Sequence, residues 1–321
     1  MITLSKLSKL ACVSVSTASK AFSGSREVNE ETRVKIFSVA KEHGVFKKFY
    51  NVKYPKLVIA VVIPEFQSGN YAPLLAEIQS ALLQKGCSMT VTASGFMPDE
   101  NTRIYDYYSK YTDVDGIIVV GTYDRSDEEL NIPCVIVDGK DEAEDLSLGV
   151  TVNAERALFD ALTYLKSRGA ETVGFISEEK THSKLKKFTD AMTRVYGKAD
   201  ERYIAVSKKR FEEGGYEGMK MLIEADRVPR ALICGYDNMA FGAIRCLRDH
   251  GYSVPYDVAV IGFDDNTESK YLAPSLSSID IKRKECAVAA VETITKMILS
   301  QPYEAPIIIE AEFKPRESSA I

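Results

Sequence analysis

The chain has 321 residues, of which 45% are hydrophobic and 27% charged, and its formal net charge at pH 7 is -5. This composition excludes a disordered chain, and the lack of a long apolar run or a signal peptide excludes a membrane span and favours a cytoplasmic protein. The charge is uneven, since residues 1–56 carry a net +7 and the remainder -12. Only the N-terminal part is therefore suited to binding phosphates, with a merely solvated lysine surface as the alternative.

The segment 3–24, TLSKLSKLACVSVSTASKAFSG, predicts two short helices joined by a tight turn. Thr3 and Ser14 are placed to cap these helices, and Gly24 ends the second one. The inner face of the second helix is expected to carry Ala18, Ala21 and Phe22. Its outer face is expected to carry Val15, Ser16, Ser19 and Lys20. A small, polar and cationic outer face of this kind fits the major groove of DNA, so the segment predicts a helix-turn-helix.

A third helix is predicted over residues 28–42, with Asn29 as its cap. Its inner face is expected to carry Val34, Phe37 and Ala40 or Lys41. The three helices form a small head that ends near residue 46. The following segment 47–56, KKFYNVKYPK, is basic and aromatic. We interpret it as a linker that lies close to DNA, although a solvated linker is also possible.

From residue 57 the pattern changes to buried strands alternating with amphipathic helices, which is typical of an α/β fold. The predicted strands are 57–63, 88–92, 116–121, 133–137, 173–177, 203–206, 231–236 and 258–263. Helices are predicted over 74–82, 154–167 and 184–196. Two doubly wound parallel sheets, each covered by helices on both faces, give a two-lobed body. Ligands of such sheets bind outside the carboxyl ends of the strands, so a cleft between the lobes is expected.

The cysteines and histidines do not predict a metal site or a cofactor. The six cysteines form no CxxC pair, and they are expected to be reduced core residues: Cys12, Cys87, Cys134, Cys234, Cys246 and Cys286. The three histidines lie far apart in the sequence. No P-loop, GxSxG or GxGxxG motif occurs either, so the protein is not expected to be an enzyme.

The chain resembles the LacI/GalR family of bacterial transcription regulators. The head carries the VS-x-x-T-x-S-[RK] pattern of the family's reading helix, and the body carries ALICGYDNMAFGAIRCLRDHGYSVPYDVAVIGFDD, PSLSSI and PRES. The resemblance implies a body related to periplasmic sugar-binding proteins, a homodimer, and an effector in the cleft. It also implies chain crossovers near 153, 281 and 309. The N-terminal lobe would then comprise 57–153 with 282–308, and the C-terminal lobe 154–281 with 309–321.

The resemblance assigns the residues of the head to two kinds of DNA contact. Val15, Ser16 and Lys20 would face base edges, which carry sequence information. The residues that would hold phosphates, and so fix the register, are Thr3, Ser14 and Thr17.

For the effector, the resemblance points to five residues: Tyr71, Asn153, Lys184, Tyr236 and Asp264. Asn153 and Asp264 suit a polyol. However, Lys184 stands where the family has a bidentate Arg, and Tyr236 where it has Asn. We expect a hydroxylated ligand such as a sugar. The alternatives are a sugar phosphate, an aromatic ligand or the absence of a small ligand.

The segment VFKKFYNVKYPKL lacks the family's early Pro and its Ala-Arg-x-Leu hinge helix, whose Leu wedges into the minor groove. Either Phe49 or Tyr50 supplies the wedge, or the segment contacts only phosphates through Lys47, Lys48 and Lys53. We favour the second interpretation, which predicts that the central operator step matters little.

Together these features predict a cytoplasmic, nucleoid-associated dimer that represses transcription from a pseudo-palindromic operator of double-stranded DNA. A metabolite would shift the population between two states of the dimer, as inducer or as corepressor. The alternative is a ligand-sensing or partner-sensing module that has weak operator specificity and no sugar effector.

Overall fold

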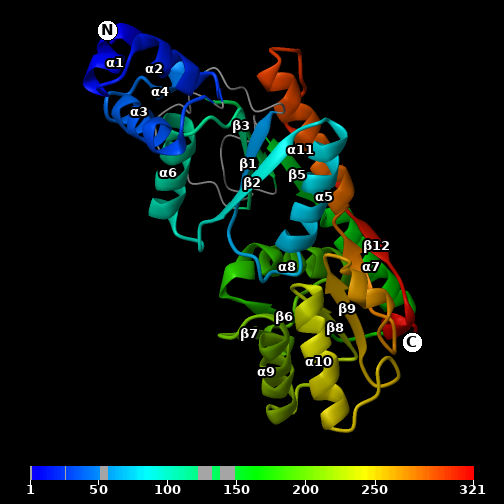
Figure 1. Ribbon diagram of the computed structural model, residues 1–321. Coiled ribbons are helices and arrows are strands. Elements are labelled where there is room, and N and C mark those ends of the chain that lie inside the picture. The colour runs from blue at the N-terminus through cyan, green and yellow to red at the C-terminus, as the bar shows by residue number, and fades with distance from the viewer. Residues whose placement is uncertain (1, 26, 51–56, 122–131, 138–148) are drawn as a thin grey trace.

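The computed structural model describes residues 2–25, 27–50, 57–121, 132–137 and 149–321. A small helical head is followed by a body of two α/β lobes, each built on a six-stranded sheet (Figure 1). The predicted fold class is therefore confirmed. No helix in the described ranges has the length and apolar character needed to span a membrane.

The head consists of four helices: α1 (Leu4–Leu10), α2 (Val15–Phe22), α3 (Glu30–Glu42) and α4 (Phe46–Phe49). The predicted caps are confirmed, because the side chains of Thr3, Ser14 and Asn29 accept hydrogen bonds from backbone N–H groups of the first turns of α1, α2 and α3. The buried core of the head contains Leu7, Ala11, Ala21, Phe22, Val28, Ile36 and Ala40.

Three details of the head differ from the predictions. Val34 is 54% exposed, and Ile36 is the buried residue, because two positions along a helix turn a side chain by about 200°. Cys12 is also exposed, in the α1–α2 turn at φ 52°, whereas the other five cysteines are buried. The aromatic rings of α4 and Tyr50 pack on the head, so its core extends beyond the expected end near residue 46.

The N-terminal lobe contains a sheet of parallel strands in the order β11-β5-β4-β3-β1-β2. The strands are β1 (Val58–Ile63), β2 (Ser88–Ala93), β3 (Gly116–Val120), β4 (Cys134–Val137), β5 (Gly149–Asn153) and β11 (Ile307–Glu310). Alternate residues of β1 point to opposite faces. Ile59, Val61 and Ile63 pack towards α5 (Tyr71–Gln84) and α11 (Arg283–Ile298), whereas Ala60 and Val62 pack towards α6 (Pro98–Asp106) and the turn after it.

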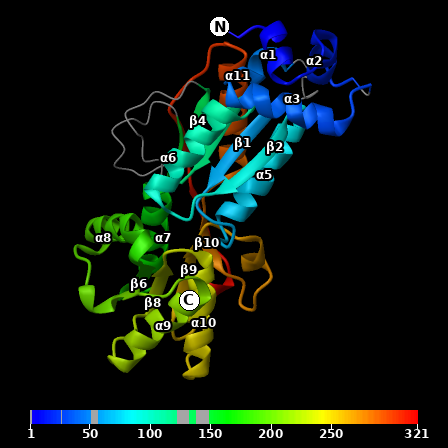
Figure 2. The ribbon, with the colours of Figure 1, turned by 60° about the vertical axis from the view of Figure 1, so that its left-hand side comes forward.

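The C-terminal lobe repeats this architecture with the order β12-β10-β9-β8-β6-β7, in which only β12 pairs antiparallel. The strands are β6 (Val173–Glu178), β7 (Ile204–Ser207), β8 (Ala231–Cys234), β9 (Ala259–Phe263), β10 (Ser277–Asp280) and β12 (Glu312–Lys314). One face packs on α7 (Glu155–Ser167) and α8 (His182–Tyr196), and the other on α9 (Phe211–Glu224) and α10 (Asp237–Asp249) (Figure 2).

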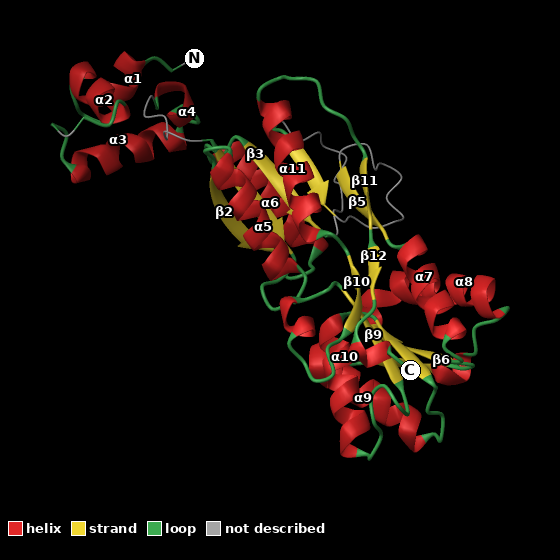
Figure 3. Cartoon of the chain, turned by 90° about the vertical axis from the view of Figure 1, so that its right-hand side faces the viewer, coloured by secondary structure: helices red, strands yellow, loops and turns green. Residues whose placement is uncertain are grey.

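The chain crosses between the lobes three times, between β5 and α7, between β10 and α11, and between β11 and β12 (Figure 3). The third crossing lies at Ala311, two residues beyond the expected position, because β11 continues to Glu310 in the N-terminal sheet. Segments that follow the carboxyl ends of strands in the two lobes meet, as the ion pair between Glu65 after β1 and Arg210 after β7 shows.

Candidate DNA-binding and effector sites

The outer face of α2 is exposed as predicted. Val15 is 45% exposed, and Ser16, Ser19 and Lys20 are also exposed. Behind them Ala18, Ala21 and Phe22 are buried, so the reading face is held on a packed support. Small side chains at the start of a helix allow its backbone to approach base edges closely, which suits the major groove.

The hydroxyls assigned to phosphate binding lie at the N-termini of α1 and α2. The Thr3 hydroxyl accepts from the backbone N–H of Lys6 at 3.3 Å, and the Ser14 hydroxyl accepts from that of Thr17 at 2.9 Å. The Ser14 and Thr17 hydroxyls also share a hydrogen bond of 2.8 Å. Both helix starts therefore combine polar side chains with the positive end of the helix dipole, which favours anions.

Lys20 is paired within the head. Its Nζ donates to Glu27 at 2.5 Å, and the two side chains are 46% and 69% exposed. A Lys20 that reads a base has to leave this carboxylate. Because both groups are well solvated, the exchange costs little.

The aromatic residues of α4 are not free to act as minor-groove wedges in this conformation. The ring of Phe49 lies 5.8 Å from that of Phe22, and Tyr50 stacks on Phe46 at 4.8 Å. Lys48 is exposed and its Nζ donates to the carbonyl of Ile2 at 3.2 Å. Lys53 and the side chain of Lys47 lie outside the described part of the chain.

Three of the five predicted effector residues lie together in the C-terminal lobe. Nζ of Lys184, in the first turn of α8, donates to the carbonyl of Gly235 at 2.9 Å and to Asp264 at 3.3 Å. The Asp264 side chain is 5% exposed and follows β9, and Lys184 also lies 4.3 Å above the ring of Phe263. Tyr236 follows Gly235 at the end of β8. The start of α8 and the segments after β8 and β9 thus present a cation, a phenol and a carboxylate.

Tyr236 is held by a hydrogen bond from Phe211 of the same lobe. Its hydroxyl accepts from the backbone N–H of Phe211 at 2.8 Å, which leaves the phenol O–H available as a donor. Burial raises the pKa of Tyr236 well above its ordinary value, so the phenol stays protonated at neutral pH. The ring of Phe211 lies 5.9 Å from that of Tyr236.

The other two predicted effector residues belong to the N-terminal lobe. Tyr71 begins α5, and its ring lies 6.4 Å from that of Phe96. Asn153 ends β5 at the first crossing, where its Nδ2 donates to Glu310 at 3.1 Å and its Oδ1 accepts from the backbone N–H of Glu155 at 3.2 Å. Asn153 therefore ties two chain crossings together.

Sequence reasoning missed five residues at the same edge. Each follows or ends a parallel strand: Glu65 after β1, Phe96 after β2, Glu178 in β6, and Arg210 and Phe211 after β7. Their position after a predicted strand was the available signal, because ligands of parallel sheets bind at the carboxyl ends. A position after a strand indicates that a residue lies at the carboxyl-end edge of its sheet, but it does not indicate which side chains meet there.

The comparisons with known proteins cover both the head and the body. Residues 162–319 match the periplasmic binding protein-like domain family. The HTH-type transcriptional repressor PurR of Klebsiella pneumoniae (strain 342) is 28% identical over 331 residues, covering 98% of this chain and 95% of PurR. The HTH-type transcriptional regulator GalR of Streptococcus thermophilus is 27% identical over 329 residues, covering 96% of each chain. These matches support the assignment of the chain to the LacI/GalR family that its sequence motifs indicate.

Two solved structures show the same fold. The Lac repressor dimer bound to operator and the anti-inducer ONPF superposes with a TM-score of 0.74 at 18% identity, covering 100% of this chain and 99% of that one. The complex of the transcriptional regulator CelR with cellobiose superposes with a TM-score of 0.71 at 22% identity, covering 99% of this chain and 100% of that one.

A buried carboxylate directly follows the predicted effector residue Tyr236 in the chain. Asp237 begins α10 and is fully buried, and it accepts hydrogen bonds from the Ser278 hydroxyl at 2.6 Å, the Ser269 hydroxyl at 2.7 Å and the Asn266 backbone N–H at 2.6 Å. It thereby ties α10 to the loop after β9 and to β10.

The burial of the Asp237 carboxyl group predicts that the stability of the protein depends on pH. Burial raises the pKa of Asp237 from 3.8 to about 7, against the hydrogen bonds that lower it. Between those two values the folded carboxyl holds a proton that the unfolded one has released. Its contribution to the free energy of unfolding therefore falls as pH rises, by up to about 1.4 kcal/mol per pH unit. Urea titrations from pH 4.5 to 7.5 should show the stability of wild type relative to Asp237→Asn shrinking with pH, and a constant difference would contradict the shifted pKa.

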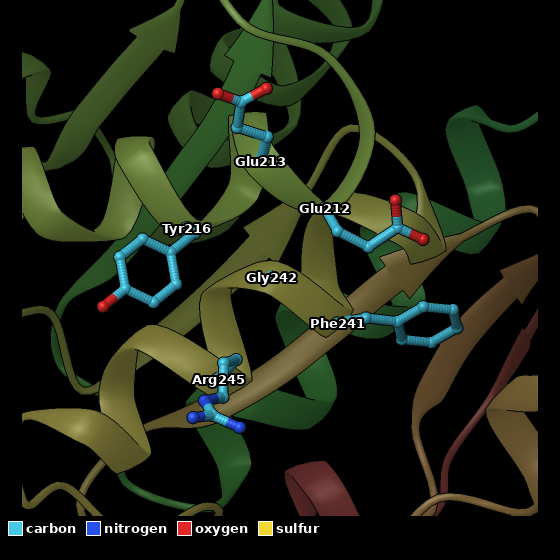
Figure 4. A pocket seen from close by; sticks show the side chains of 6 residues that line it. All are labelled: Glu212, Glu213, Tyr216, Phe241, Gly242 and Arg245. Atoms are coloured by element: carbon cyan, nitrogen blue, oxygen red, sulfur yellow. The ribbon is translucent and has the colours of Figure 1, made fainter.

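A shallow pocket of about 440 Å³ lies elsewhere, on the outside of α9 and α10 (Figure 4). It is lined by Glu212, Glu213, Tyr216, Phe241, Gly242 and Arg245. None of the predicted effector residues lines it. The candidate effector residues lie instead at the carboxyl ends of the strands, where hydrogen-bond donors and acceptors converge.

Proposed function

We propose that this LacI/GalR protein is a transcriptional repressor that binds a specific operator through α2. The exposed Val15, Ser16 and Lys20 on a buried support carry this proposal, and the relatives named as transcriptional repressors support it. Such a regulator works in the cytoplasm, at the nucleoid. Because the rings of Phe49 and Tyr50 pack in the head, the segment after it contacts phosphates alone, and the centre of the operator contributes little to affinity.

The operator is bound by a homodimer, so its half-sites form a pseudo-palindrome. Two observations support a dimer interface on the C-terminal lobe. Tyr271 is 82% exposed and Leu272 is 36% exposed, and Arg248 of α10 donates to the neighbouring carbonyl of Ala273 at 3.0 Å. Exposed apolar side chains grouped beside a helix favour association with a second copy.

The effector is an uncharged hydroxylated metabolite, such as a sugar, in the interlobe cleft. At this edge the cations Lys184 and Arg210 are each paired with a carboxylate. A phosphate would have to displace a carboxylate to bind either of these two cations. Asp264 and the phenol of Tyr236 instead offer the acceptor and donor that hydroxyl groups require. The ligand acts by binding one lobe arrangement more tightly than the other.

Base reading is tested by Lys20→Ala with Glu27→Gln as the matched control. Lys20→Ala should cost roughly 1–3 kcal/mol for the cognate operator and little for variants altered at the base it contacts. Glu27→Gln releases Lys20 from its partner and should bind at least as tightly as wild type. Fluorescence anisotropy on an operator series measures both. A uniform loss across the series would show that Lys20 only contacts phosphate, and would favour a module with weak operator specificity.

A further inference from the structure

Two side chains from opposite lobes meet in an ion pair across the cleft. Glu65 follows β1 in the N-terminal lobe, and Arg210 directly precedes α9 in the C-terminal lobe. Nη1 and Nη2 of Arg210 donate to the two carboxylate oxygens of Glu65, both at 2.7 Å. This bidentate arrangement is the most specific that a guanidinium and a carboxylate can form. The side chains are 27% and 18% exposed, so water screens the pair only partly.

Glu178 holds the guanidinium in position. Nε of Arg210 donates to Oε1 of Glu178 at 3.3 Å, while Oε2 of Glu178 accepts from the backbone N–H of Lys180 at 3.1 Å. The Glu178 side chain is 4% exposed. Arg210 is therefore oriented by its own lobe before it meets Glu65, which reduces the entropy lost when the lobes come together.

An aromatic ring from the N-terminal lobe strengthens the contact. Phe96 lies 3.4 Å below Nζ of Lys180 and 5.3 Å from Cζ of Arg210, both in the C-terminal lobe. Cations over the face of a ring are attracted to it, most of all where water is partly excluded. Phe96 has φ 62° and Phe211, next to Arg210, has φ 55°. Left-handed backbone is unfavourable for phenylalanine, so surrounding contacts must hold both residues.

The rim of the cleft is closed beside this pair. A Cβ at Gly69 in the N-terminal lobe would lie 2.3 Å from Oδ1 of Asn238 and 2.6 Å from Nδ2 of Asn266, both in the C-terminal lobe. The two lobes therefore approach to van der Waals contact here. Glu65 and Arg210 join surfaces that already touch.

We propose that Glu65, Arg210, Phe96 and Lys180 form an interlobe latch that keeps the cleft closed without a ligand. The closed arrangement is then the resting state of the protein. A ligand that requires the open form binds with an affinity reduced by the small open population. This inference concerns the body alone and does not depend on operator binding.

The latch is tested by measuring the distance between the lobes in the ligand-free, full-length protein. Nitroxide labels are placed at Leu83→Cys in α5 and Met221→Cys in α9, which are 58% and 46% exposed, with the exposed Cys12 replaced by Ser. Double electron–electron resonance then gives the distribution of closed and open forms. The parent should show predominantly the short distance.

Glu65→Gln keeps the size of the side chain and removes its charge, and it should raise the ratio of open to closed forms about tenfold. The matched control is Glu100→Gln on the N-terminal lobe, whose carboxylate pairs with the neighbouring Arg103 of the same lobe and should leave the distribution unchanged. Phe96→Leu repeats the test on a separate residue if Glu65→Gln fails to fold. A distribution for the folded variant that superposes on that of the parent overturns the latch, as does a parent that is mainly open.

Discussion

Replacing Phe22 by Ala is expected to unfold the head while the body stays folded. The Phe22 ring is 1% exposed and lies 5.3 Å from Phe37, 6.0 Å from Phe46 and 5.8 Å from Phe49. Removing a buried aromatic ring costs about 3–5 kcal/mol, and a head of roughly 50 residues has little more stability than that. Differential scanning calorimetry should lose the head's transition, and operator binding should vanish.

Val34→Ala is the matched control for Phe22→Ala. It removes an apolar side chain from the same head, but Val34 is 54% exposed. Its effect on stability should stay within about 0.5 kcal/mol, with operator binding retained. A folded, operator-binding Phe22→Ala protein would show that the aromatic cluster does not hold the head together.

Replacing Gly215 by Ala should strongly destabilise the C-terminal lobe. A Cβ at Gly215 would lie 1.8 Å from the backbone oxygen of Met239, so α9 and α10 would have to move apart. A clash with backbone cannot be relieved by a rotamer change, and we expect a loss of about 3 kcal/mol. Because α9 begins beside Arg210 and α10 begins at Asp237, the displacement should also disturb the proposed effector site.

The effect of Gly215→Ala is measured by urea unfolding of the body and by titration with an effector. Glu213→Ala serves as the control in the same helix, since that side chain is 71% exposed. The control should retain wild-type stability within about 0.5 kcal/mol. A Gly215→Ala protein of wild-type stability would mean that the two helices are not packed as closely as described.

The head was predictable from its sequence to the level of single hydrogen bonds. A hydroxyl or amide side chain that precedes apolar residues at helical spacing is expected to cap the helix by accepting a hydrogen bond from a backbone N–H of its first turn. Thr3, Ser14 and Asn29 do so. Eight of the twelve strands described in the body were predicted from their largely apolar runs. The strands β5, β10, β11 and β12 were not predicted, because these short strands mix apolar and polar residues. The aromatic packing of α4 was not visible, since the basic residues Lys47 and Lys48 dominate the composition of that segment.

The candidate effector residues at the carboxyl ends of the strands were predictable only in part. Lys184 and Asp264 were found through the family's motifs, and the structure pairs them. The pair of Glu65 with Arg210 joins residues 145 positions apart in different lobes, and neither lies in a motif that signals the other. Such a contact depends on how two sheets are placed against each other, which local spacing does not encode.

Recognition of a specific operator by α2 is tested most directly by selecting duplexes from a random pool with the full-length protein. The selected duplexes should share two half-sites related by two-fold symmetry, with a variable centre, and their binding should fall steeply with salt. The double variant Ser16→Ala, Lys20→Ala should retain weak, salt-dependent binding and lose the enriched half-sites. Failure of the wild-type protein to enrich any sequence, or enrichment of the same half-sites by the double variant, would contradict reading by α2.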